Sequence, residues 1–254
     1  MLILLSPSKT LMAEKSTADF GHSQPLFPRE ATELIRQLKK LSTRQLEELM
    51  KISTKLAWLN QERFALWQPE FSTDTASQAI FSFKGEVYHG LDITTMQAEE
   101  VENSQRHLRI LSGLYGVLRP LDLIRPYRLE IGSAFGFGKY RDLYQFWRQK
   151  ITRQIGLDLK ESGSNLLINL ASQEYFSAIE HKKLKASIVT PHFLESRDDG
   201  YKIVTVYTKK ARGKMTRYIL ENPIESEEDL RGFDSDGYYF NSNLSKPGAP
   251  VFTR

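Results

Sequence analysis

Helical and strand patterns alternate along this chain. The clearest helix is predicted over 142–159, where Leu143, Trp147, Ile151 and Ile155 recur every four residues and Asp142 begins the segment, favourable to the helix dipole. Apolar spacing predicts further helices over 29–40, 43–50, 55–67 and 99–110. Strands are predicted over 165–170, 186–193 and 201–208, and an initial apolar run predicts a buried strand over Leu2–Leu5.

The connections between these elements decide the class of fold. Helices separate some of the strands, whereas the turn sequence ESRDDG at 195–200 predicts a hairpin between two others. We therefore expect an α/β (mixed α+β) fold in which helices pack on a mixed β-sheet. No Gly/Ser-rich, Pro-rich or single-charge stretch is long enough to be a linker, so we expect one domain over 1–254.

The composition excludes several classes of chemistry. The chain has no cysteine, which excludes disulfides, thiolate metal ligands, iron–sulfur clusters and a cysteine nucleophile, and fits a cytosolic protein. The four apolar residues after Met1 are too few for a signal peptide or a membrane span. We expect a cytoplasmic monomer that does not contact a membrane.

Charge is segregated in a way that the net charge of +4 conceals. Residues 201–217 carry basic side chains and no acidic one, residues 221–236 are mostly acidic, and a second basic stretch spans 106–128. Such segregation can build a basic cleft that steers polyanions, although a solvated surface is the simpler explanation of any single charged run. The basic side chains concerned include Arg119, Arg125, Arg128, Lys209, Lys210, Arg212, Lys214 and Arg217.

Motifs that would define an enzyme or a metal site are missing. The segment SPSKT after the first predicted strand contains Lys9 but lacks the glycines of a phosphate-binding P-loop, and neither G-x-G-x-x-G nor G-x-S-x-G occurs. The histidines show no paired spacing typical of metal ligands. We therefore assign no catalytic residue, no metal and no cofactor.

One polar cluster follows a predicted buried strand. Asn169, Ser172, Glu174 and Tyr175 lie just past 165–170, where open α/β sheets often bind ligands. Helix capping is the simpler role, because Ser172 can cap a short helix and Glu174 suits its first turn. Carboxylates that could join Glu174 around a hard cation, without any spacing that requires it, are Asp122, Glu130 and Asp142.

Segment 49–64, LMKISTKLAWLNQERF, spans the boundary between two predicted helices. A helix-hairpin-helix holds a DNA phosphate with the backbone amides of its turn and a nearby lysine, and its usual sequence resembles L-P-G-I-G-x-K-x-A. Leu49, Ile52, Lys55 and Ala57 keep that register, so we predict a helix-hairpin-helix-like element over 43–67. The alternative is a corner between two helices of an ordinary core.

Two residues depart from that pattern. Lys51 and Ser53 stand where glycines normally permit close backbone approach and positive φ. The hydroxyls of Ser53 and Thr54 and the N-terminus of the second helix could hold the phosphate instead, with Arg63 on the same helix.

Two other basic segments could contact phosphates. Glycines and prolines stiffen 111–132, so its arginines suit bidentate phosphate contacts or, equally, ion pairs with Asp122 or Glu130. A helix beginning near Lys209 would place Lys210, Lys214 and Arg217 on one face, where a bound polyanion would relieve their mutual repulsion.

Six segments resemble one family in order along essentially the whole chain. The segments are MLILLSPSKT, FKGEVYHGL, LSGLYGVLRPLDLIRPYRLEIG, DLYQFW, INLASQEYF and KKARGKMTRYI. Together they resemble the YaaA family of bacterial peroxide-stress proteins. The resemblance implies a cytoplasmic protein that limits the iron available for Fenton chemistry and binds DNA, with a single α/β domain, a positively charged cleft and a helix-hairpin-helix. Matching residues that could line such a cleft are Lys9, Arg119, Arg128, Lys209, Lys210, Arg212 and Arg217.

Three functions follow as hypotheses. The first is a protein that binds duplex or junction DNA with little sequence preference through the hairpin and the basic cleft. The second is an enzyme acting on a nucleotide or nucleic acid, or an iron-handling protein, with a polar pocket around Asn169 and Glu174. The third is a structural protein that binds a partner through an exposed apolar patch.

Overall fold

The computed structural model describes residues 1–12 and 20–254, and its centre is a five-stranded mixed sheet. Strand order is β6-β5-β1-β8-β9; β5, β1, β8 and β9 run parallel, and β6 pairs antiparallel with β5. The four residues of β1 are fully buried, which confirms the predicted buried strand. The strands are β1 (Leu2–Leu5), β5 (Leu108–Ser112), β6 (Gly116–Leu118), β8 (Leu166–Asn169) and β9 (Ser187–Val189).

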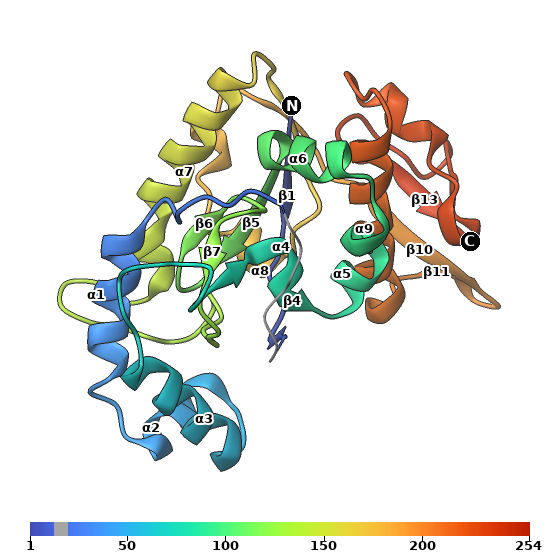
Figure 1. The fold of residues 1–254 in the computed structure, drawn as a ribbon. Helices are drawn as coiled ribbons and strands as arrows, with labels where there is room; N and C mark the ends of the chain where they lie inside the picture. Colours follow the sequence, from blue (N-terminus) through green and yellow to red (C-terminus); the bar gives the residue numbers. More distant parts are fainter. Residues whose placement is uncertain (13–19) are drawn as a thin grey trace.

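Two long helices flank this sheet. In α7 (Leu143–Glu161), Trp147 is buried and the Asp142 side chain accepts a hydrogen bond from the Gln145 amide, as a helix cap does. Figure 1 shows α7 and α1 (Pro28–Leu38) along one flank of the molecule and α9 (Thr205–Glu221) on the opposite side. The predicted mixed α/β class is confirmed.

Short elements complete the chain. A second sheet has the order β11-β10-β13-β12, and two strand pairs, β2 with β4 and β3 with β7, lie beside the central sheet. The strands are β2 (Thr10–Leu11), β3 (Ser77–Gln78), β4 (Phe83–Lys84), β7 (Leu123–Ile124), β10 (His192–Arg197), β11 (Gly200–Lys202), β12 (Tyr239–Phe240) and β13 (Val251–Thr253). The remaining helices are α2 (Thr43–Met50), α3 (Thr54–Ala65), α4 (Ala79–Ser82), α5 (Glu86–Leu91), α6 (Ala98–His107) and α8 (Gln173–Phe176), with 3-10 turns at Ile93–Thr95, His181–Lys183, Glu228–Gly232 and Ser235–Gly237.

Three predicted elements were wrong in part. The helix expected over 99–110 ends at His107, because the next residues form β5 beside β1. The strand expected over 186–193 is two strands in different sheets, interrupted at Pro191, which has no amide hydrogen to donate to a ladder. The strand expected over 201–208 ends at Lys202, and α9 begins at Thr205, four residues before the helix start predicted near Lys209. The hairpin predicted at 195–200 joins β10 and β11 and is confirmed.

Tertiary packing explains the early start of α9. This helix crosses α5 closely, and a Cβ added at Gly213 would lie 1.8 Å from the Val87 carbonyl oxygen. A Cβ added at Gly90 would lie 2.1 Å from the Lys210 carbonyl oxygen. These backbone contacts outweigh the local β-propensity of 205–208, and they fix the basic part of α9 beside the ends of the central strands.

Candidate nucleic-acid interface

A cavity of about 500 Å³ lies where the carboxyl ends of β1 and β8 approach α5, α8 and α9. Open α/β sheets bind ligands at this edge. The lining side chains come from five parts of the chain that are distant in sequence. They include Ser6, Ser8, Lys9, Tyr88, Tyr127, Arg128, Glu130, Ser172, Glu174, Tyr175, Lys209 and Arg212. We call this space the inner cavity.

Hydrogen bonds tie the ends of β1 and β8 together at the inner cavity. Ser6 Oγ accepts from the Ser172 amide at 2.8 Å and lies 3.2 Å from Ser172 Oγ. The Tyr88 hydroxyl donates to the Ser6 carbonyl oxygen at 3.0 Å. Ser172 does occupy the N-cap position of α8, but its hydroxyl makes no capping bond. Its side chain therefore holds two strand ends together instead of stabilising the helix.

Two carboxylates of the inner cavity are already engaged. Glu130 Oε1 lies 3.2 Å from Arg128 Nη2 and 3.5 Å from Lys9 Nζ, so the predicted ion pairing of a 111–132 arginine with Glu130 is present. Glu174 Oε1 accepts a hydrogen bond from the Gly132 amide at 3.1 Å. Glu174 thus lines the cavity and does not simply extend into solvent.

Lys209 and Arg212 are cations without a carboxylate partner in the described part of the chain. Arg212 is half-buried, its Nε atom is inaccessible, and that atom has no hydrogen-bond acceptor within residues 1–12 and 20–254. Burial lowers the pKa of Arg212. Its neighbour His192 offers no negative charge: burial and then the charge of Arg212 lower the pKa of that imidazole.

A second hollow of about 830 Å³ adjoins the inner cavity. The two share Lys9, Arg128, Glu130 and Glu174, and the second continues to Lys51 at the end of α2. Together they form one depression, which we call the cleft. The cleft contains carboxylates as well as cations, and its cations Lys51, Lys209 and Arg212 have no carboxylate partner among the described residues. Its cations are Lys9, Lys51, Arg128, Lys209 and Arg212.

Helices α2 and α3 stand together at the end of the molecule away from the N-terminus (Figure 1), joined by a three-residue turn. Lys51 takes a left-handed conformation with φ 51°, although it is not a glycine. The amides of Lys51 and Ile52 both donate to the Glu47 carbonyl oxygen. Ser53 has φ −69° and its hydroxyl makes no capping bond. Ala57 is buried, whereas Ser53, Thr54 and Lys55 are exposed.

Several cations proposed from the sequence lie outside the cleft, and four of them pair with a carboxylate. Arg119 pairs with Asp122 at 2.9 Å, as the alternative prediction for this arginine expected. Lys210 and Lys214 do share one face of α9, but both pair with Asp236, at 3.2 Å and 3.3 Å. Arg217 pairs with Glu221 at 2.7 Å, and Arg63 is half-buried in α3, where burial lowers its pKa.

The remaining polar candidates have structural contacts. Asn169 Oδ1 accepts from the Ala171 amide at 3.1 Å, and Asn169 Nδ2 donates to Thr190 at 3.3 Å, so this side chain orders the loop after β8. Asp122 and Asp142 bind Arg119 and the start of α7 and do not gather around Glu174. Over residues 1–12 and 20–254 there is no cluster of three or more His, Asp or Glu side chains suited to a metal ion.

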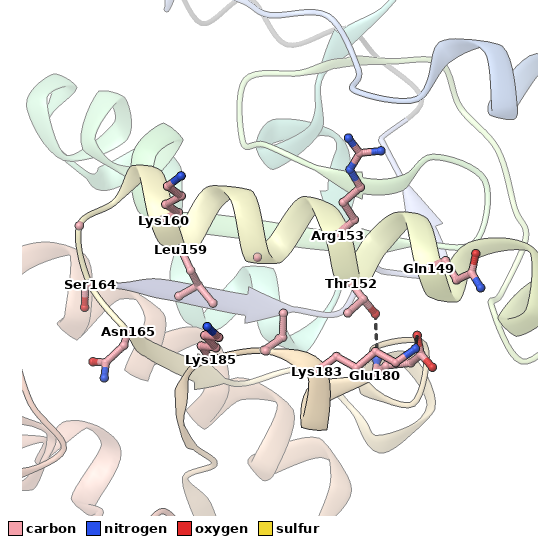
Figure 2. A pocket seen from close by; sticks show the side chains of 13 residues that line it. Gln149, Thr152, Arg153, Leu159, Lys160, Ser164, Asn165, Glu180, Lys183 and Lys185 are labelled. Atoms are coloured by element: carbon pink, nitrogen blue, oxygen red, sulfur yellow. Dashed lines mark hydrogen bonds and ion pairs between the residues drawn. The ribbon is translucent and has the colours of Figure 1, made fainter.

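A third hollow, also about 830 Å³, lies between α7 and residues 180–185. Its basic side chains do not converge: Figure 2 shows Arg153 and Lys160 leaving α7 on the side away from Glu180 and Lys185. The Glu180 amide donates to Thr152 Oγ1 at 2.9 Å, which closes one end. This hollow is therefore a packing groove.

Sequence reasoning did not identify Ser6, Ser8, Tyr88 and Tyr127 as site residues. Ser6 and Ser8 directly follow the first predicted strand, so the rule that ligands bind past buried strands could have found them. Tyr88 and Tyr127 reach the cavity only through tertiary packing, and no local pattern marks them. None of the helices in the described ranges is long and apolar enough to cross a membrane.

The fold and the cleft define a mixed α/β protein with a depression, lined by both cations and carboxylates, at the carboxyl edge of its central sheet. Residues 1–244 match the family model described as peroxide stress protein YaaA. UPF0246 proteins of Shewanella baltica (strain OS195) and Shewanella sediminis (strain HAW-EB3) are each 46% identical over 254 residues, which is 100% of this chain and 99% of each relative. The chain belongs to the YaaA family of peroxide stress proteins, as the sequence resemblance predicted.

Proposed function

We propose that this protein protects the cell under peroxide stress by binding DNA, duplex or junction, through the phosphates that the cleft attracts. The observation that carries the proposal is that Lys51, Lys209 and Arg212 lack carboxylate partners in the described residues and lie along one continuous depression. Cations that are not neutralised by the protein can displace counterions from phosphates.

The helical hairpin supports this proposal at one end of the cleft. Lys51 adopts the positive φ for which the hairpin motif normally uses glycine, whereas Ser53, at the second glycine position of the motif, has φ −69°. The first amides of α3 have no acceptor within their own helix, as at any helix start, and exposed Ser53, Thr54 and Lys55 lie beside them. A phosphate at this turn would be held by amides and side chains together.

The expected binding has little sequence preference, because lysines and backbone amides contact phosphates and not base edges. Binding takes place in the cytoplasm in this proposal. Limitation of intracellular iron, which the family resemblance implies, is a separate role that DNA binding does not require.

Lys51 and Lys209 are the two unpaired lysines at opposite ends of the cleft. The double variant Lys51→Gln with Lys209→Gln is expected to bind all duplex sequences more weakly, by about tenfold or more. The matched control is Lys210→Gln with Lys214→Gln, which removes the same charge from lysines already paired with Asp236. Fluorescence anisotropy with two unrelated duplexes and a four-way junction measures the affinities. Equal losses in the cleft variant and the control would contradict the assignment of the cleft.

A further inference from the structure

We propose that the inner cavity binds a single nucleotide, with its phosphate at Arg212 and Lys209 and its base against the buried tyrosines. The phosphate could belong to a free nucleotide or to a nucleotide extruded from DNA bound in the cleft. Only the second source rests on the proposed DNA binding.

The size of the inner cavity suits one nucleotide. Its volume of about 500 Å³ is within the range of roughly 300–1,000 Å³ that small-molecule sites occupy. A double helix is far too wide to enter a cavity of this volume, whose walls include the residues that follow β1 and β8 and parts of α5, α8 and α9. The phosphates of a duplex can reach its mouth, and one unpaired nucleotide can reach its interior.

Arg212 gives this cavity a site for an anion. A cation removed from water is costly unless an anion compensates it, and here the described residues supply neither a carboxylate nor an acceptor for Nε. A phosphate monoester satisfies a guanidinium with two parallel hydrogen bonds. Lys209, exposed and also without a described partner, would bind the same group one helical turn away.

The rest of the cavity wall suits a base and a sugar. Tyr88, Tyr127 and Tyr175 are each at most 7% exposed, and together they form an apolar, aromatic surface. Hydrogen bonds fix two of these rings: Tyr88 donates to Ser6, and the Tyr127 hydroxyl lies 2.6 Å from Ser112 Oγ. Glu174, toward the other hollow, can accept hydrogen bonds from sugar hydroxyls or base amines.

The test is isothermal titration of the full chain with AMP, dTMP, adenosine and inorganic phosphate. We expect both nucleotides to bind, and AMP to bind at least tenfold more tightly than adenosine. Arg212→Gln should weaken AMP binding at least tenfold, whereas Arg153→Gln, which removes an arginine from the groove of Figure 2, should leave it unchanged. Thermal melting checks that each variant is folded. If Arg212→Gln does not fold, Arg212→Lys is tested in its place.

The proposal would be overturned if neither AMP nor dTMP bound with a Kd below about 1 mM, which corresponds to a binding free energy on the order of −4 kcal/mol. Equal affinities for AMP and adenosine would overturn it as well. A duplex with the fluorescent base 2-aminopurine in a mismatched pair distinguishes an extruded nucleotide from a free one. A fluorescence change on protein binding that excess AMP reverses indicates an extruded nucleotide, and AMP binding without such a change indicates a free one. If the unmodified protein bound AMP but no DNA, the proposed DNA binding would be contradicted and the nucleotide site would not.

Discussion

Asp158→Ala is expected to lower the free energy of unfolding by about 3–5 kcal/mol, because it leaves a buried cation unpaired. Arg109, on central strand β5, places its Nε 2.6 Å from Asp158 Oδ2 on α7, and the side chains are only 7% and 5% exposed. Arg109 Nη1 also donates to the carbonyl oxygens of Gln105 and Leu108, but these neutral acceptors cannot replace the lost charge.

Urea denaturation measures this loss, with Glu228→Ala as the control. The Glu228–Arg231 pair is exposed, with side-chain exposures of 66% and 53%, and its loss should cost about 1 kcal/mol or less. The double variant Arg109→Met with Asp158→Leu should recover most of the stability, because it removes both charges. If Asp158→Ala lowered the free energy of unfolding by less than about 1 kcal/mol, the expectation that buried Arg109 needs the Asp158 carboxylate would be contradicted.

Gly213→Ala is expected to destabilise the protein by ~1–3 kcal/mol, even though alanine favours a helix more than glycine does. The added Cβ would lie 1.8 Å from the Val87 carbonyl oxygen and 2.7 Å from the Leu91 amide nitrogen, so α5 and α9 must separate. Because these helices carry Tyr88 and Arg212, we expect weaker DNA binding as well.

The control for this substitution is Gly156→Ala in α7. A Cβ there would meet only Leu184 Cδ2, at 3.6 Å, which is ordinary contact. We expect this variant to gain up to about 1 kcal/mol from helix propensity. Thermal unfolding of both variants checks the pair, and a similar gain for Gly213→Ala would contradict the close crossing of α5 and α9.

Elements with a strong local signal were predictable from the sequence, and elements decided by tertiary contacts were not. The apolar repeat of α7 and the apolar run of β1 indicate within their own residues which side chains are buried. Both predictions were confirmed. Residues 205–208 are β-branched and aromatic and favour a strand locally, yet Gly213 docks the whole segment on α5 as a helix.

Some residues of the candidate site could also be predicted from the sequence, and others could not. The position of Glu174 past a buried strand indicated a pocket, and the structure places it in the inner cavity. Sequence could not separate Lys209 from Lys210, because only tertiary structure brings Asp236 to one of these neighbours and not to the other. The turn between α2 and α3 has no glycine, and only the backbone shows that Lys51 takes a left-handed conformation whereas Ser53 does not.

The salt dependence of DNA binding tests the role of the cleft most directly. Three unpaired cations should give a slope of log K against log salt concentration of about −2.7 or steeper, at about −0.9 for each phosphate. Lys51→Gln with Lys209→Gln should make that slope shallower by about 1.8, and Lys210→Gln with Lys214→Gln should leave it unchanged. A slope near zero for the unmodified protein, or the same slope in the cleft variant, would contradict phosphate binding in the cleft.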